Sequence, residues 1–91
     1  KLIDLKDFFD KSVKLYLLVD EMMKIKTKDD ADMAFLVCSD ETDNADLIIF
    51  PNKFNLLKDI KIGDIVNVYG RVEKRYDKYQ ILVNDIKKVY K

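Results

Sequence analysis

The sequence predicts an all-β domain, folded as a small closed barrel of five strands with two short helices. Three observations predict this fold. Residues 23–51 alternate between apolar and polar side chains and are interrupted by polar turns, which is typical of half-buried strands. Residues 63–75 and 79–86 repeat the pattern. Between these two groups the apolar spacing changes from two residues to three, which indicates a short helix.

Length and composition are those of one folded domain. The chain has 91 residues, of which 48% are hydrophobic, and it carries 17 basic and 17 acidic side chains. This composition favours a folded core over disorder. No apolar run is long enough to span a bilayer, and acids interrupt the apolar N-terminal stretch, so we expect neither a membrane segment nor a signal peptide. We expect one domain over residues 1–91, cut from a longer protein because the chain starts at Lys1 without an initiator Met.

Several kinds of chemistry are excluded by residue content. The chain has no His and one Cys, Cys38, so it cannot form an internal disulfide or the usual zinc site, which suits a cytoplasmic location. The acids cluster at loops and no phosphate-binding glycine loop occurs. Cys38 shares its phase with apolar neighbours and is interpreted as a buried side chain. We expect a binding module rather than an enzyme, with no catalytic residue, cofactor or metal.

The first two elements are a short helix and a long strand. Apolar spacing over residues 4–9 predicts a helix that covers one end of the barrel, with Asp4 as its cap. Residues 13–28 predict a strand whose alternation is broken at Leu18 and Met23. A long strand that changes phase is typical of a bulged strand that serves both sides of a barrel.

A polar loop at residues 29–32 and a turn at residues 41–44 border the second strand, residues 33–40. Within the turn, Asp43 and Asn44 tolerate the left-handed backbone that hairpins often need. The third strand covers residues 45–50 and ends at Pro51. The second strand places Ala34, Leu36 and Cys38 on one face and Phe35, Val37 and Ser39 on the other.

The remaining elements are a helix and a hairpin. Residues 52–60 predict a helix capped by Asn52, and residues 61–64 a turn centred on Gly63. The fourth strand spans residues 65–76, the turn 77–78, the fifth strand 79–86 and a basic tail 87–91. In the fourth strand Gly70 interrupts an inward-facing row of valines, at a position where a small barrel needs a bend or a close approach.

This order of elements is the arrangement of the OB-fold barrel. The segments MAFLVCSDETDNADLIIFP (residues 33–51) and IGDIVNVYGRVEKR (residues 62–75) resemble the OB domain in the alpha subunit of bacterial DNA polymerase III. That domain belongs to a wider family of nucleic-acid-binding OB domains that includes anticodon-binding modules. The resemblance implies a role in DNA replication, with single-stranded DNA and other domains of the parent polymerase as partners.

The chain departs from this family at three positions. Asp43 and Asn44 replace a glycine-containing turn, Leu17 replaces a glycine in the first strand, and the first loop reads DDAD instead of being basic. Three acids beside the lysines that would hold phosphate predict weak binding. Basic residues interleaved with aromatics around the last hairpin predict little sequence dependence.

Two groups of side chains are candidates for the binding surface. Phe35 is expected to point outward, where an aromatic ring can stack on a base; the alternative is that it packs under the N-terminal helix or another domain. Basic and aromatic residues interleave around the last hairpin, and the alternative for its arginines is pairing with Glu73 or Asp85. The full candidate set is Lys24, Lys26 and Lys28, expected on one face, with Phe35, Val37, Ser39, Tyr69, Arg71, Lys74, Arg75, Tyr76 and Lys78.

Three functions remain open at this point. The first is weak binding of single-stranded DNA. The second is a protein-interaction or scaffold module, which the zero net charge favours. The third is RNA binding of the anticodon type.

Overall fold

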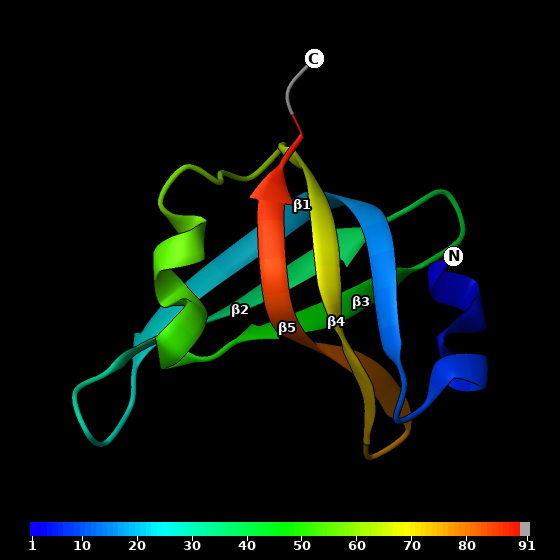
Figure 1. Cartoon of the computed structure of the whole chain (residues 1–91), viewed down its shortest axis with the longest axis horizontal. Helices are drawn as coiled ribbons and strands as arrows, with labels where there is room; N and C mark the ends of the chain where they lie inside the picture. Colours follow the sequence, from blue (N-terminus) through cyan, green and yellow to red (C-terminus); the bar gives the residue numbers. More distant parts are fainter. Residues whose placement is uncertain (90–91) are drawn as a thin grey trace.

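In the computed structural model, which describes residues 1–89, five strands form a closed barrel with the order β1-β2-β3-β5-β4 (Figure 1). Hydrogen-bonded neighbours are antiparallel except β3 and β5, which run parallel. The predicted fold is therefore confirmed. The basic tail was predicted at residues 87–91. Lys87 and Lys88 belong to β5, and residues 90–91 lie outside the described residues. The strands are β1 (Ser12–Lys26), β2 (Asp32–Ser39), β3 (Asn44–Ile49), β4 (Ile65–Arg75) and β5 (Lys78–Lys88).

The long strand β1 bends so that it closes the barrel. Its first half pairs with β4 and its second half with β2, and Leu18 takes part in both ladders. The register against β2 shifts between Val19 and Glu21. The predicted bulge is therefore present. Since a bulge increases local twist and bend, one strand can serve both sides of the barrel.

The barrel interior is filled by the inward-facing rows of all five strands. Leu17, Leu36, Val68 and Ile81 are each 1% exposed or less. Cys38 lies among them with no exposed surface, and burial, reinforced by the nearby Asp20 charge, raises the pKa of its thiol to about 12. The thiol is protonated at neutral pH, so Cys38 acts as a small apolar side chain.

Gly70 is buried where β4 approaches β5 closely. A Cβ atom at this position would lie 2.5 Å from the carbonyl oxygen of Leu82 and 2.7 Å from Cγ2 of Ile81. The register of the β4–β5 ladder shifts between Tyr69 and Gly70. The predicted close approach at this glycine is confirmed.

Both helices are short 3-10 helices, η1 (Leu2–Phe8) and η2 (Pro51–Leu57). The predicted caps Asp4 and Asn52 are wrong, because the helices begin earlier and neither has a side-chain hydrogen bond at its cap. In η2 the first residue is Pro51, which loses nothing there since the first N–H groups of a helix have no internal partner. Tertiary burial holds both helices, because the buried leucines of η1 and Leu57 of η2 belong to the core cluster.

Asp40 organises the turn between β2 and β3 and attaches η1 to it. Its carboxylate accepts hydrogen bonds from the Thr42 hydroxyl (2.6 Å) and from the backbone N–H groups of Thr42 (2.7 Å), Asp43 (3.1 Å) and Leu2 (2.8 Å). Burial alone would raise the pKa of Asp40, but these hydrogen bonds outweigh it and lower the pKa to about 2. Neither Asp43 nor Asn44 has a positive φ, so the turn does not use the left-handed backbone expected there.

No helix within residues 1–89 is both long and apolar enough to cross a membrane.

Candidate nucleic-acid interface

A groove of about 550 Å³ opens on the outer face of the barrel, where β2 and β3 meet the β4–β5 hairpin. We call it the hairpin groove. It is lined by Phe35, Leu36, Val37, Asp46, Ile48, Arg75, Tyr76, Asp77, Lys78 and Gln80.

The floor of the hairpin groove comes from two neighbouring strands. Phe35 on β2 pairs with Ile48 on β3, and Val37 pairs with Asp46 one row away. Ile48 is only 5% exposed, yet it lies outside the core cluster because its phase points away from the barrel axis. Phe35 is half-buried beside it and lines this groove, not the cavity next to η1; the alternative that it packs against another domain stays open. Its flat ring and the branched Ile48 make an apolar floor.

One wall of the groove is the β4–β5 hairpin, whose turn is Tyr76–Asp77, one residue earlier than predicted. Tyr76 has φ 56° and is 86% exposed. A bulky residue with a positive φ is uncommon and costs conformational energy, so the turn adopts this backbone at an energetic cost. The Arg75 guanidinium lies 5.9 Å from the centre of the Tyr76 ring. An aromatic side chain and a cation therefore stand together at the mouth of the groove.

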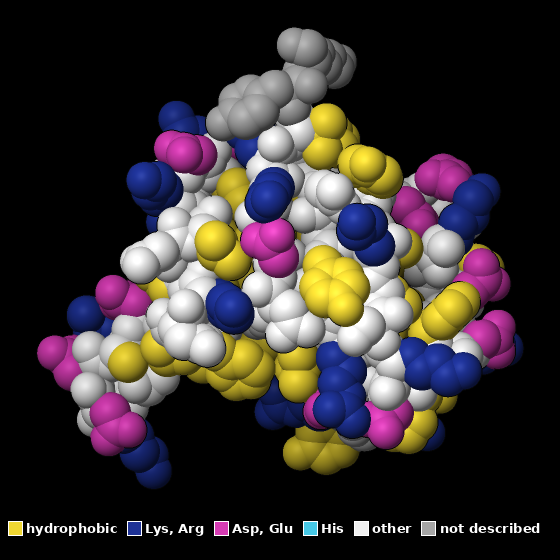
Figure 2. Space-filling view, in the orientation of Figure 1, with side chains coloured by type: hydrophobic (Ala, Val, Ile, Leu, Met, Phe, Trp, Pro, Cys, Tyr) yellow, Lys and Arg dark blue, Asp and Glu magenta, His cyan; other side chains and the backbone are white. Residues whose placement is uncertain are grey.

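Apolar side chains continue from the groove floor across β2 to the second half of β1. Met23 pairs with Phe35, and Ile25 pairs with Met33. Met23 is 62% exposed and Ile25 is 37% exposed. We call these four residues with Ile48 the apolar strip. Figure 2 shows hydrophobic side chains gathered along the lower edge of the view. They lie between the β1–β2 loop, at the lower left of Figure 1, and the β4–β5 turn at its bottom.

The lysines before the first loop do not lie on this surface. Lys24 pairs with Ala34 and so shares its inward phase, and the Lys24 ammonium lies 5.9 Å from the Phe54 ring on η2. Lys26 forms ion pairs with Asp32 (3.1 Å) and Asp30 (3.8 Å). The prediction that three lysines share one strand face is wrong for Lys28, because β1 ends at Lys26. Two acids of the first loop, Asp30 and Asp32, therefore pair with Lys26.

The other predicted residues on the strands do not line the groove. Tyr69 and Arg71 are on the outer face of β4, where Arg71 pairs with Asp10 and not with Glu73 or Asp85. The Lys74 ammonium lies 5.8 Å from the Tyr79 ring. Ser39 ends β2 and pairs with Asn44. The hairpin groove brings together five of the predicted residues: Phe35, Val37, Arg75, Tyr76 and Lys78.

Sequence reasoning missed the other five lining residues, Leu36, Asp46, Ile48, Asp77 and Gln80. For Ile48 a signal exists: three apolar residues in succession at 47–49 require one of them to face outward in a strand. Asp46 and Gln80 meet only because β3 pairs with β5 in parallel, 34 residues apart in the chain. The apolar and polar pattern of β3 or of β5 alone does not predict this parallel pairing, which closes the barrel.

The groove has the composition of a binding surface. Its charged groups are Asp46 and Asp77 against Arg75 and Lys78, so the two signs balance. Within residues 1–89 there is no grouping of three or more His, Cys, Asp or Glu side chains that would hold a metal ion. Apolar floor, exposed aromatic ring and adjacent cations are suited to stacking flat ligands and contacting anionic groups.

This geometry agrees with comparison to known families. Residues 16–89 match the family model tRNA_anti-codon, described as an OB-fold nucleic acid binding domain, and the chain belongs to this family. It is an OB-fold nucleic-acid-binding domain.

Relatives in bacteria share its sequence. DNA polymerase III subunit alpha of Bacillus subtilis (strain 168) is 32% identical over 75 residues, which cover 81% of this chain and 7% of the relative. The subunit of the same name from Staphylococcus aureus (strain Mu50) is 31% identical over 68 residues, or 74% of this chain and 6% of the relative. The chain thus spans less than a tenth of the length of these relatives.

Solved structures share its fold. The hypothetical protein ygiW from E. coli superposes with a TM-score of 0.68 at 22% identity, covering 97% of this chain and 86% of that one. The second OB-fold domain of replication protein A from Methanococcus maripaludis gives a TM-score of 0.53 at 21% identity, covering 92% and 87% of the two chains.

Proposed function

We propose that this domain binds single-stranded DNA weakly and with little sequence dependence, as a module of a bacterial DNA polymerase III alpha subunit. The relatives carry this name, and the parent protein would supply the polymerase activity while this domain contributes binding alone. Other domains of that subunit are then its protein partners, and its place of action is the cytoplasm, where bacterial DNA is copied.

The observation that carries the proposal is the junction of Phe35 and Ile48 with Tyr76 in one groove. OB folds bind oligonucleotides on the face of strands 2 and 3, between the first loop and the loop joining strands 4 and 5. The hairpin groove and the apolar strip occupy that face. Stacking on an aromatic ring accepts any base, since every base has a flat π-face, which explains the small sequence dependence.

Charge sets the expected strength of binding. Arg75 and Lys78 supply phosphate contacts, but Asp46 and Asp77 lie in the same groove and Lys26 is paired with loop acids. Few phosphates are neutralised, so affinity is modest and its salt dependence shallow but measurable.

Fluorescence anisotropy with labelled oligo-dT tests the proposal. We expect binding at low salt that weakens as salt rises, because counterions are released when phosphates are contacted. Phe35→Ala should reduce affinity about fivefold or more, since stacking contributes about 1–3 kcal/mol per base. Tyr16→Ala is the matched control, because Tyr16 is an exposed aromatic on β1 outside the groove and should leave affinity unchanged. Absence of binding at low salt, or equal effects of both variants, refutes the proposal.

A second function is favoured by one observation. The exposed Met23 and Ile25 extend the apolar strip beyond the groove, and such side chains suit a protein partner. This reading predicts that Met23→Ser weakens a contact with the rest of the polymerase subunit while oligo-dT affinity is unchanged.

Competition between matched RNA and DNA oligonucleotides separates RNA binding from the main proposal, because only RNA offers the 2′-hydroxyl.

A further inference from the structure

The barrel has a gap on the side covered by η1. The parallel β3–β5 ladder begins only at the pair Asp46 and Gln80. Upstream of that pair, residues 44–45 and 78–79 are not paired with each other. The facing edges of the two strands separate there, and openings of this kind at the end of a barrel are common places for ligands.

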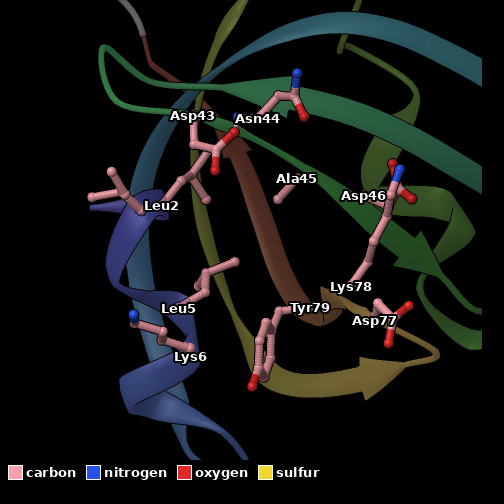
Figure 3. A pocket seen from close by; sticks show the side chains of 11 residues that line it. Leu2, Leu5, Lys6, Asp43, Asn44, Ala45, Asp46, Asp77, Lys78 and Tyr79 are labelled. Carbon is pink, nitrogen blue, oxygen red and sulfur yellow. Dashed lines mark hydrogen bonds between the residues drawn. The ribbon is translucent and has the colours of Figure 1, made fainter.

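A cavity of about 280 Å³ fills this gap (Figure 3). Leu2 and Leu5 reach into it from η1, and Ala45 and the Tyr79 ring line it from β3 and β5. We call it the η1 cavity. Its surface is apolar where η1 meets the strands and flat along the Tyr79 ring. Its volume is just below the usual range for ligand sites of roughly 300–1,000 Å³, so it has room for one small flat group.

The η1 cavity continues the hairpin groove. Asp46, Asp77 and Lys78 line both, so one surface leads from the first to the second past the turn of the hairpin. In Figure 3 the Lys78 side chain extends from the hairpin in the direction of Asp46. A strand that lies in the groove can therefore place its next nucleotide at the mouth of the η1 cavity.

The polar groups of the cavity favour a base over a phosphate. Its lining holds three carboxylates, on Asp43, Asp46 and Asp77, but only two lysines. One Asp43 oxygen accepts the Asn44 N–H (2.8 Å), and its other oxygen has no hydrogen bond within residues 1–89. A free carboxylate oxygen repels phosphate and accepts a hydrogen bond from an amino group. Cytosine, adenine and guanine carry such a group on the base, whereas the one donor of thymine, its ring N3–H, lies between two carbonyl oxygens that a carboxylate repels.

We propose that the η1 cavity takes one unstacked nucleobase of the bound strand and prefers a base with an exocyclic amino group, which donates to Asp43. This rests on the proposed binding of single-stranded DNA in the hairpin groove. The domain would then bind mostly without regard to sequence, with a modest preference at a single position.

The test compares ten-nucleotide oligo-dT with the same strand carrying one central dC, dA or abasic site; about ten nucleotides fall within the range of roughly 4–16 that one OB fold covers. We expect the dC and dA strands to bind about fivefold more tightly than oligo-dT, the effect of one net hydrogen bond. The abasic strand should show no gain. Amide signals of Ala45 and Tyr79 should shift with the dC strand and not with the abasic strand.

Two charge-matched variants complete the experiment. Asp43→Asn keeps the oxygen that accepts the Asn44 N–H and should bring the dC to dT affinity ratio to one. Glu41→Gln removes a carboxylate from the same turn outside the cavity and should leave the ratio as in the wild type. Equal binding of all strands by the wild type overturns the cavity proposal while the groove proposal stands. No binding of any strand overturns both.

Discussion

Phe35 on β2 and Ile48 on β3 lie directly opposite each other on the outer face of the barrel, and Ile48 is nearly buried although it faces away from the core. An apolar pair in this place contributes nothing to the interior, since the barrel is already filled by the inward rows. Its position on the strand face between the first loop and the last hairpin links the fold to nucleic-acid binding.

Replacing Tyr76 with glycine distinguishes its contribution to oligo-dT affinity from its effect on the free energy of unfolding. Tyr76→Gly removes the exposed ring but accepts the positive φ without strain, so we expect oligo-dT affinity to fall and the free energy of unfolding not to fall. Anisotropy and urea unfolding measure the two quantities. Unchanged affinity in a stable variant would remove Tyr76 from the proposed interface.

The two arginines of the chain should behave differently. Arg75 lines the groove, whereas Arg71 is paired with Asp10 outside it. We expect Arg75→Gln to make the salt dependence of log K shallower by about 0.7, the value for one phosphate contact to a single strand. Arg71→Gln should leave the slope unchanged. Titrations of both variants with oligo-dT across a salt series test this, and equal slopes would count against the groove.

Asp40 makes stability depend on acid pH. Its pKa is lowered to about 2 in the folded state from the ordinary value of 3.8, so its contribution is complete above pH 4 and is lost as the pH falls from 4 towards 2. Allowing for solvent screening, the contribution is on the order of 1–2 kcal/mol. Urea unfolding should show Asp40→Asn less stable than wild type at pH 6, with the difference shrinking towards pH 2. A constant difference would mean that the carboxylate charge is not involved.

Gly70 is expected to tolerate no side chain. In Gly70→Ala the new Cβ would meet the Leu82 carbonyl oxygen and Ile81 Cγ2, both closer than real contacts allow. We expect a loss of about 1–3 kcal/mol in the free energy of unfolding. Gly63→Ala is the comparison, because that Cβ meets no atom within 4 Å and any loss there comes from its positive φ alone. Chemical unfolding of both variants separates crowding from backbone strain.

Much of the fold follows from local pattern. Alternation located all five strands to within a few residues, and the break in phase near Leu18 revealed the bulge of β1. Helix ends were not predictable from caps, because each 3-10 helix has seven residues and is held by buried leucines instead of side-chain caps.

The site was predictable only in part. Phe35 and the hairpin residues carry local signals, namely an outward phase and interleaved charge. The alternation around Lys24 was misleading. The bulge reverses the phase of β1, so this lysine shares the phase of the inward-facing Ala34 and lies near the Phe54 ring of η2. Asp46 and Gln80 meet through the parallel closure of the barrel, which depends on the whole fold.

A backbone amide chemical-shift titration with oligo-dT tests the central claim most directly. We predict that the shifts concentrate at Phe35, Ile48 and Tyr76, with little change at Lys14 and Tyr16 on the outer face of β1. Shifts centred on Lys14 and Tyr16, or no shifts at low salt, would contradict the assignment of the hairpin groove as the binding surface.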